Sequence, residues 1–232
     1  AALAGESWTT ADRIAPYFGS TAVVPWGDEL PLLFDFPLSD AVLLGIATGD
    51  AGKVGAALDA VARLYPAGVG DAPFLTNHDQ VRAASQLGGD PAKLRLAAAI
   101  LLTLQGTPFL YYGEEIGMEN GACAADQCKR TPMAWDGTPN RGFTSGTPWW
   151  PPAPAGPAAS VAAQTGDPAS LLSRYRTLIR VRKASPALRR GGTQRLVTGP
   201  SVLAFLRQDP GETVLVAHNF GATAATQAVT AP

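Results

Sequence analysis

Short apolar runs alternate with longer amphipathic stretches over the first part of the chain. Four of these runs have the length of buried strands: Ala1–Gly5, Leu32–Phe36, Ala72–Thr76 and Pro108–Tyr112. The stretches between them carry apolar residues at helical spacing. The pattern therefore predicts a parallel α/β sheet or barrel, in which helices connect successive strands.

Capping residues mark where several helices begin. Asp90 followed by Pro91 predicts a helix start, because aspartate caps a first turn and proline fits within it. Ser39 is expected to cap a short helix after Pro37 has closed the preceding strand. The predicted helices are about Thr9–Tyr17, Asp40–Ile46, Lys53–Tyr65, Asp90–Leu104 and Leu171–Lys183.

The last of these helices has a basic side, which we interpret as a solvated face. Its members are Arg174, Arg176, Arg180, Arg182 and Lys183.

The pattern changes twice in the second half of the chain. Residues from about 120 to 167 are rich in Gly, Pro, Ala and Thr, which predicts a long loop. Three tryptophans within it indicate that part of the loop is packed, because disordered segments rarely contain them. After residue 191 the short segments 194–198, 202–208, 213–219 and 223–229 predict a small antiparallel β domain. We expect residues 1–190 to form the α/β part and residues 191–232 the β domain.

Polar side chains follow the predicted strands. The carboxyl ends of parallel strands meet at one face, which is where a TIM barrel places its active site. Eight strands close such a barrel, whereas four leave an open edge. The sequence therefore predicts half of a barrel. The polar residues at the strand ends are Glu6, Asp35, Asn77, His78, Asp79, Glu114 and Glu115.

The third strand runs into the segment FLTNHDQ, Phe74–Gln80, which places an acid next to an imidazole. Such a pair can hold a sugar or stabilise charge near a reaction centre. The alternative is a simple turn, because Asn and Asp commonly leave strands through hydrogen bonds to the backbone.

Composition and charge exclude several classes of partner. The net charge of -1 and the isoelectric point near 6.1 do not provide the basic surface that nucleic acid or anionic lipid requires. No apolar run approaches the ~20 residues of a membrane span. The first residues lack the basic region of a signal peptide. We therefore expect neither nucleic acid nor a membrane as a partner.

The two cysteines, Cys123 and Cys128, lie close together in the long loop. They can close a small disulfide, which would indicate an extracytoplasmic location, or they can be two free thiols. No histidine is near them, so they do not suggest a zinc site.

Three long motifs, FLTNHDQ, LLTLQGTPFLYYGEEIGM and KRTPMAWD, resemble the α-amylase superfamily of retaining glycoside hydrolases. AGESWT is similar to the fifth-strand motif of that family, and FDFP to its sixth-strand segment. The terminal β segments resemble its C-terminal β-sandwich. The resemblance implies strands 5–8 of a (β/α)8 barrel followed by an antiparallel β-sandwich domain.

The resemblance also implies roles for individual residues. Glu6 matches the general acid/base, and Asp79 matches the carboxylate that stabilises the oxocarbenium-like transition state. His78 matches the histidine that hydrogen-bonds sugar hydroxyls. Further substrate contacts are expected from Trp8, Asn77 and Arg130. Support for the end of the last strand is expected from Tyr111, Tyr112, Glu114 and Glu115.

The family's nucleophilic aspartate lies at the end of the fourth strand and would precede Ala1. We therefore expect this chain to be a C-terminal portion that is inactive alone and works with an N-terminal fragment of the same enzyme. The implied substrates are α-1,4-glucans: starch and maltooligosaccharides. The alternatives are an α-glucosidase, a transglycosylase, or a non-catalytic carbohydrate-binding homologue. We expect no cofactor in this chain, although the complete enzyme could bind calcium. The expected location is secreted or periplasmic.

Overall fold

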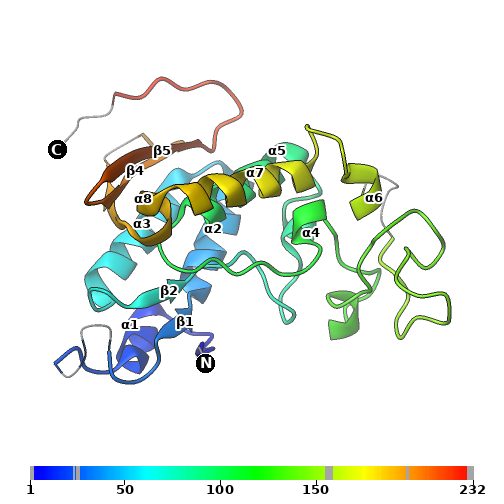
Figure 1. The fold of residues 1–232 in the computed structure, drawn as a ribbon, viewed down its shortest axis with the longest axis horizontal. Coiled ribbons are helices and arrows are strands. Elements are labelled where there is room, and N and C mark those ends of the chain that lie inside the picture. The colour runs from blue at the N-terminus through cyan, green and yellow to red at the C-terminus, as the bar shows by residue number, and fades with distance from the viewer. Residues whose placement is uncertain (1–2, 23, 25–26, 155–158, 197–198, 229–232) are drawn as a thin grey trace. The chain divides into compact units, whose positions relative to one another are not determined.

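The computed structural model describes residues 3–22, 24, 27–154, 159–196 and 199–228 (Figure 1). The chain divides into two compact units, which we describe separately. Unit 1 consists of Ala1–Phe74, Ile100–Phe109 and Arg182–Pro232, and unit 2 of Leu75–Ala99 and Leu110–Val181. The predicted boundary at residue 190 is a different division and stays a prediction.

Two short parallel strands form a small sheet in unit 1. Strand β1 (Leu32–Phe34) pairs in parallel with β2 (Gly70–Ala72), with Leu33 opposite Asp71. Gly5 forms an isolated parallel bridge with Leu33 on the other side of β1. The order of these three segments in space is therefore their order in the chain, as expected for part of a parallel α/β sheet.

The predicted fourth strand, Pro108–Tyr112, is not a regular strand in the structure. Its start still runs along β2, because the N–H of Thr107 donates to the Asp71 carbonyl at 2.8 Å and the N–H of Phe109 to the Pro73 carbonyl at 2.9 Å. Both segments advance by two residues between the two bonds, which is a parallel arrangement. The predicted bounds of the strand Ala72–Thr76 are wrong, because β2 spans Gly70–Ala72 and shares only Ala72 with the predicted segment.

The helices of unit 1 differ from the predicted ones mainly in α2. A short helix, α1 (Ala11–Ile14), continues as the 3-10 turn η1 (Ala15–Phe18), and α3 spans Ala51–Leu64. Helix α2 spans Phe36–Thr48, so the predicted start at Ser39 is wrong.

Asp35 rather than Ser39 caps α2. Its Oδ1 accepts the N–H of Leu38 at 2.9 Å, and Pro37 occupies the first turn, where its lack of an N–H is not a disadvantage. Ser39 is buried inside the helix. Pro37 therefore opens a helix where we expected it to close a strand.

Two buried arginines satisfy the carbonyl end of α5 (Pro91–Thr103), the helix predicted from Asp90–Pro91. Arg182, at the end of α7 (Leu171–Ala184), donates to the carbonyls of Leu102, Leu104 and Gly106 at 3.0, 2.8 and 2.6 Å. Arg207 donates to the Thr103 carbonyl at 2.7 Å. The interpretation of the basic side of α7 as a solvated face is therefore wrong for Arg182, which is buried.

A three-stranded antiparallel sheet forms the C-terminal part of unit 1. Its strands are β3 (Gly192–Arg195), β4 (Val202–Asp209) and β5 (Glu212–Asn219), in that order. Helices α3 and α8 (Pro186–Arg190) contact this sheet (Figure 1). The last predicted segment, 223–229, forms no strand over residues 223–228, and Val229 lies outside the described residues. In the first predicted segment, 194–198, Val197 and Thr198 also lie outside them.

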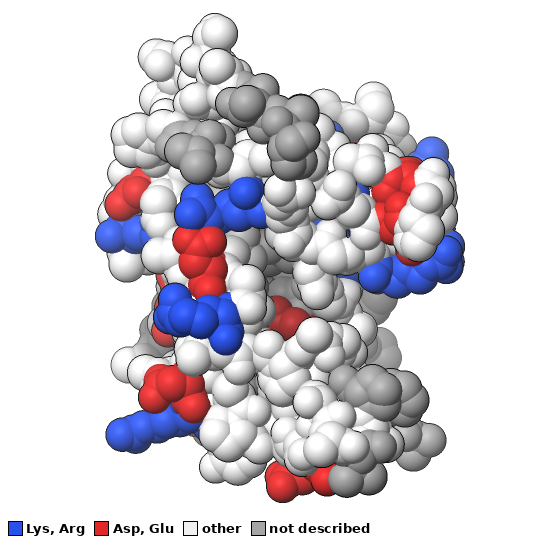
Figure 2. All heavy atoms as spheres, turned by 90° about the vertical axis from the view of Figure 1, so that its left-hand side faces the viewer, with Lys and Arg blue, Asp and Glu red and all other residues white. Residues whose placement is uncertain are grey.

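Charged side chains around this sheet are paired. Arg190 Nε lies 2.8 Å from Asp209 Oδ2, and Arg195 Nη2 lies 2.6 Å from Asp59 Oδ2. On the face shown in Figure 2, basic and acidic side chains are interspersed.

Unit 2 contains one long loop region and several short helices. Its short helices are α4 (Ala83–Gln86), η2 (Glu114–Ile116), η3 (Asp126–Cys128) and α6 (Val161–Gln164). A small core packs Ile116, Met118 and Met133 against Leu172 of α7. Asp90 caps α5 as predicted, with its Oδ1 accepting the N–H groups of Ala92 and Lys93.

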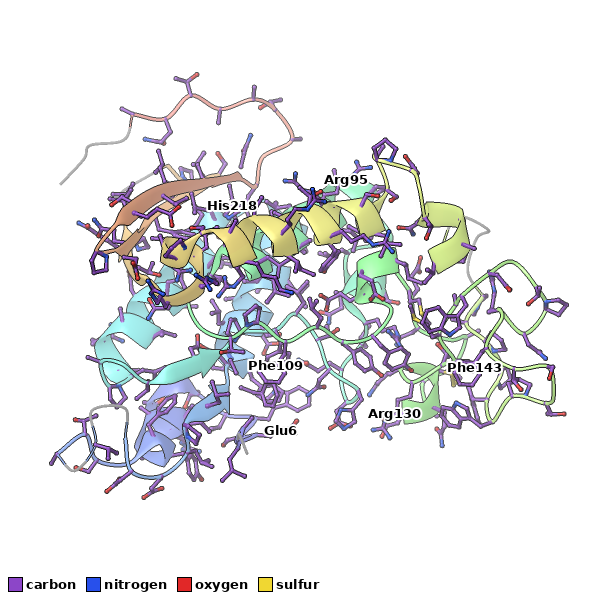
Figure 3. The ribbon with its side chains drawn as sticks, viewed as in Figure 1. Glu6, Arg95, Phe109, Arg130, Phe143 and His218 are labelled. Atoms are coloured by element: carbon purple, nitrogen blue, oxygen red, sulfur yellow. A yellow bond between two sulfur atoms is a disulfide. The ribbon has the colours of Figure 1, made fainter. Side chains whose placement is uncertain are left out.

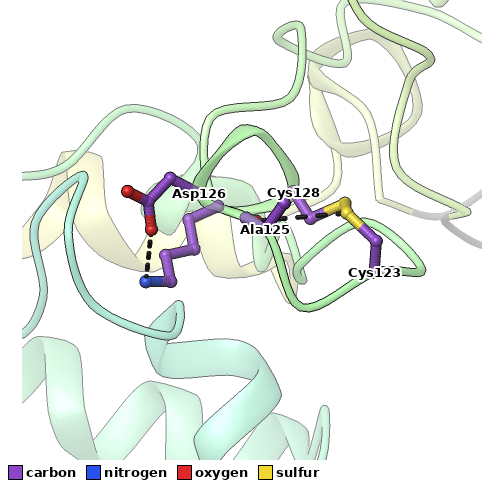
Figure 4. The surroundings of a disulfide bond; sticks show 5 residues. Cys123, Ala125, Asp126 and Cys128 are labelled. Carbon is purple, nitrogen blue, oxygen red and sulfur yellow. Dashed lines mark hydrogen bonds and ion pairs between the residues drawn. A yellow bond between two sulfur atoms is a disulfide. The ribbon is translucent and has the colours of Figure 1, made fainter.

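Cys123 and Cys128 form a disulfide within this loop region (Figure 4). Their Cα atoms are 5.7 Å apart and five positions separate them in the chain. Of the two alternatives that the sequence left open, the structure therefore has the bridged one.

None of the helices in the described part of the chain combines the length and apolar character that a membrane crossing requires.

Candidate active site

The segment after Thr76 forms a tight turn in unit 2. Asn77 Oδ1 accepts the N–H of Asp79 at 2.9 Å, and Gln80 Oε1 accepts the N–H of Asn77 at 3.2 Å. The turn that the sequence offered as an alternative is therefore present. It coexists with exposed polar groups, because the side chains of His78 and Asp79 are 54% and 40% exposed.

Arg130 holds this turn through two nitrogen atoms. Its Nη2 donates to Asp79 Oδ1 at 2.6 Å, and its Nε donates to the His78 carbonyl at 3.0 Å. His78 Nε2 lies 3.5 Å from the other carboxylate oxygen, Asp79 Oδ2. We call Asn77, His78, Asp79 and Arg130 the Asp79 cluster.

Two further charged residues support the cluster and were not predicted. Lys129 Nζ donates to the Asp79 carbonyl at 2.8 Å and to Asp126 Oδ1 at 3.0 Å. Asp126 Oδ2 also lies 3.7 Å from Arg130 Nη2. Its hydrogen bond with Lys129 lowers the pKa of Asp126. These ion pairs could have been predicted from the sequence, because Asp126 precedes Lys129 and Arg130 by three and four positions, a spacing that brings side chains together on a helical turn.

Tyr111 and Tyr112 fix the backbone on either side of Arg130. The Tyr111 hydroxyl donates to the Lys129 carbonyl at 3.0 Å, and the Tyr112 hydroxyl donates to the Thr131 carbonyl at 2.7 Å. We expected these tyrosines to support the end of a strand. In the structure they support the segment that carries Arg130.

Arg82 lies beneath these two tyrosines. Its guanidinium is 4.5 Å from the ring centroid of Tyr111 and 4.7 Å from that of Tyr112, which is the geometry of a cation–π contact. Its Nη1 donates to the Tyr112 carbonyl at 2.7 Å. Burial lowers the pKa of Arg82 and raises that of Tyr111.

Glu114 is buried behind the tyrosines, in η2. The hydroxyl of Tyr175 donates to its Oε1 at 2.7 Å. Burial raises the pKa of Glu114 to about 8, with a smaller contribution from the charge of Glu115. A carboxyl group in this environment holds its proton at neutral pH.

A groove of about 580 Å³ adjoins the Asp79 cluster and is lined largely by apolar groups. We call it the aromatic groove. Its lining residues are His78, Tyr111, Tyr112, Glu115, Arg130, Pro132, Met133, Trp135, Phe143 and Trp149. Arg130 and Phe143 are labelled in Figure 3, where both lie in the loop region of unit 2.

The other predicted site residues, Glu6 and Trp8, belong to unit 1. Glu6 is exposed and directly follows the residue that bridges to β1. Trp8 is 59% exposed and stacks on Phe36, with ring centroids 5.0 Å apart and planes inclined by 20°. The structure thus brings Asn77, His78, Asp79 and Arg130 together, and the pairing of Glu6 with Asp79 stays a prediction.

A second set of buried acids lies in unit 1. Burial raises the pKa of Asp35 to about 6. Burial and then the charge of Asp35 raise the pKa of Asp71 well above its usual value. Three polar atoms here are buried and have no hydrogen-bond partner among the described residues: the Tyr65 hydroxyl, Asp35 Oδ2 and Asp71 Oδ1.

Metal-ligating side chains are not clustered in the part of the chain that the structure describes. It contains no group of three or more His, Cys, Asp or Glu side chains placed to hold a metal ion. The absence of calcium from this chain stays a prediction.

Comparison with known proteins gives consistent matches. The family described as "Alpha amylase, catalytic domain" matches residues 35–191. "Alpha-amylase 3" of Dictyoglomus thermophilum is 35% identical over 223 residues, which cover 94% of this chain and 42% of that protein. A "Probable alpha-glucosidase" of Rhizobium meliloti is 36% identical over 174 residues, covering 66% of this chain and 31% of that protein.

A solved structure, that of α-amylase from H. orenii, is similar with a TM-score of 0.81 and 34% identity, and covers 94% of this chain and 43% of that one. The chain thus spans less than half the length of each of these three proteins. The prediction of a partial barrel is confirmed, because the structural neighbours are barrels of one family. The strand numbers 5–8 and the β-sandwich stay predictions. Since the family match covers more than half of the sequence, the chain belongs to the α-amylase family.

Proposed function

We propose that this chain supplies the acid/base and the transition-state carboxylate of a retaining glycoside hydrolase that acts on α-1,4-glucans. The observation that carries the proposal is the exposed Asp79 carboxylate, which is held at 2.6 Å by Arg130 and flanked by His78. Membership of the α-amylase family and the similarity to proteins named α-amylase support it.

The proposed reaction has two displacements. In the first, a nucleophilic carboxylate bonds to the anomeric carbon while Glu6 protonates the departing glycosidic oxygen. In the second, Glu6 takes a proton from the water molecule that cleaves this covalent intermediate. Asp79 stabilises the positive charge on the sugar ring in both transition states, and His78 binds its hydroxyl groups. The product keeps the anomeric configuration of the substrate.

The nucleophile is proposed to come from polypeptide outside these 232 residues. Calcium in the complete enzyme and a secreted or periplasmic location are also proposals. The second is supported by the disulfide between Cys123 and Cys128, because such bonds persist in oxidising compartments.

The test compares this chain alone with a longer protein that also contains the N-terminal barrel segments. We expect the chain alone to release no nitrophenol from a nitrophenyl maltoside. In the longer protein, Glu6→Gln and Asp79→Asn are each expected to lower kcat roughly a thousandfold or more. Proton NMR should show the α-anomer as first product. Turnover by the chain alone, free of other polypeptides, would contradict the external nucleophile, and full activity of either variant would contradict its role.

An α-glucosidase is the second candidate. One support is Arg130 of KRTPMAWD, which bonds to Asp79 and matches an arginine that helps close the pocket in α-glucosidase-like members of the family. The other is the similarity to a probable α-glucosidase. Chromatography of the products of maltoheptaose separates the candidates. Glucose as sole early product indicates an α-glucosidase, mixed maltooligosaccharides indicate an α-amylase, and longer products indicate a transglycosylase. Binding without any product indicates a non-catalytic homologue.

A further inference from the structure

Arg82 is a buried cation that forms no ion pair with an acid among the described residues. The residue is 2% exposed, and the ion pairs of the described part of the chain do not include it. Glu114, whose charge acts on Arg82, holds its proton at neutral pH, because burial raises its pKa to about 8. Burying a charge without an ionised partner is costly, so Arg82 does more than fill space.

The ring faces of Tyr111 and Tyr112 take the place of that partner. The guanidinium carbon lies 4.5 and 4.7 Å from the two ring centroids. Adjacent side chains of a regular strand point to opposite faces, so the irregular backbone at these two residues is what allows both rings to meet one guanidinium. The position of Arg82 therefore constrains the orientation of both rings.

Each ring passes this constraint to the segment that carries Arg130. The hydroxyl of Tyr111 bonds to the carbonyl immediately before Arg130, and that of Tyr112 to the carbonyl immediately after it. Arg130 bonds in turn to Asp79, which precedes Arg82 by three positions. The contacts thus form a closed circuit that begins and ends in the turn of Asp79, and all of its members belong to unit 2.

The main chain of Arg82 is fixed separately from its side chain. Its N–H donates to Asn120 Oδ1 at 2.9 Å, and the N–H of Asn120 donates to Ser85 Oγ at 2.8 Å. Substituting the side chain should therefore leave the backbone of Arg82 in place. The role of the guanidinium can be tested by substitution for this reason.

We propose that Arg82 is a positioning residue for the proposed reaction: through Tyr111 and Tyr112 it sets the orientation of Arg130, and hence that of the Asp79 carboxylate. Arg82 is buried and is not among the residues that line the aromatic groove, so it acts through these neighbours. The inference rests on the proposed function and adds a residue to it. Because Asp79 is proposed to act in the transition state, the effect falls on kcat more than on KM.

The test is a double-mutant cycle in the longer, active protein, measured as kcat and KM for maltoheptaose. We expect Arg82→Lys to lower kcat roughly tenfold and to leave KM nearly unchanged, because lysine keeps the charge and loses the planar fork. In the Arg130→Lys background the same substitution should change kcat by less than about twofold, because the residue through which it acts is already replaced. Tyr112→Phe keeps the ring and removes the bond to the Thr131 carbonyl, and should lower kcat about threefold.

Arg182→Lys is the matched control, because Arg182 is also a buried arginine that donates to carbonyls and lies outside the Asp79 cluster. It should lower the thermal unfolding midpoint and leave kcat unchanged. A second measurement needs no turnover and uses NMR spectra of the 232-residue chain. Exchange of the Arg130 Nε–H with water should become faster in Arg82→Lys and keep its rate in Arg182→Lys, because this N–H donates to the His78 carbonyl.

Two results would overturn the inference. Additive effects of Arg82→Lys and Arg130→Lys on kcat would show that the two residues act independently. An unchanged exchange rate of the Arg130 Nε–H in Arg82→Lys would show that the fork does not depend on Arg82. If Arg82→Lys does not fold, Tyr112→Phe takes its place in both measurements. A longer protein without glycosidase activity would contradict the proposed function, and the exchange rate would then decide whether Arg82 positions Arg130.

Discussion

Arg130 is the residue on which the geometry of the Asp79 cluster depends most directly. Its guanidinium bonds to the Asp79 carboxylate and to the His78 carbonyl with two different nitrogen atoms, so it fixes both the side chain and the backbone of the turn. A lysine presents one nitrogen at the end of a flexible stem and cannot reproduce this fork. The ion pair is 37% exposed on the arginine side, so its effect should be on positioning more than on stability.

We therefore expect Arg130→Lys to lower kcat/KM for maltooligosaccharides roughly tenfold or more in the longer, active protein. The thermal unfolding midpoint should change little. The measurement is steady-state kinetics on maltoheptaose together with calorimetric unfolding. Arg174→Lys, at an exposed position of α7, is the matched control and should leave both quantities unchanged. Equal activity of Arg130→Lys and the parent protein would show that the fork does not position Asp79.

At the scale of elements, the sequence predicted the segments whose signals are local. Asp90 followed by Pro91 located the start of α5, and the alternation of apolar runs indicated parallel segments, two of which pair as regular strands. Pro37 misled the prediction, because the same residue suits the end of a strand and the first turn of a helix. Arg182 could not be assigned from its helix alone, since its partners lie in another segment, at the end of α5.

The site was predictable to the extent that motifs are contiguous in sequence. FLTNHDQ and KRTPMAWD identified His78, Asp79 and Arg130, and the structure places these three in contact. The contributions of Tyr111 and Tyr112 were not predictable, because each acts through the backbone of a residue some 18 or 19 positions away. The aromatic groove likewise requires the conformation of a loop that has no periodic pattern.

The disulfide between Cys123 and Cys128 constrains the loop that leads into Lys129 and Arg130. It closes a loop with a sequence separation of 5, and Cys128 directly precedes Lys129 and Arg130. Removing it with the pair Cys123→Ser and Cys128→Ser should lower the free energy of unfolding by about 2 kcal/mol in the loop-entropy estimate. The measurement is urea unfolding with and without a reducing agent. Reductant should destabilise the parent protein and leave the double variant unchanged, and an equal response of both would contradict the prediction.

At the scale of the whole molecule, both units contain buried acids with raised pKa values. The pKa of Glu114 is about 8 in unit 2, and that of Asp35 about 6 in unit 1. Each group binds its proton more tightly in the folded than in the unfolded state. Between the unfolded and the folded pKa the folded protein therefore carries more protons, and stability falls as pH rises. The acids with lowered pKa values, such as Asp126, lose their contribution to the stability of the folded state only at lower pH.

We therefore expect the thermal unfolding midpoint to decrease from about pH 5 to about pH 8. Glu114→Gln should flatten the upper part of this decrease, because the amide does not ionise. The measurement is a calorimetric series over this range for both proteins. Glu119→Gln, at an exposed position in unit 2, is the control and should keep the slope of the parent. A midpoint that is constant or rises over the range in the parent protein would contradict the prediction.

The contact of Arg207 with α5 has a consequence for the modularity of the chain. Arg207 belongs to β4 and donates both to the Thr103 carbonyl and to the Gly191 carbonyl, each at 2.7 Å. Burial and the neighbouring charge of Arg182 lower its pKa to about 10, so its placement is costly unless these carbonyls accept its hydrogen bonds. The negative end of α5 also stabilises both cations. The C-terminal sheet is therefore not a detachable module, and exchanging it for the sheet of a relative requires a donor at position 207.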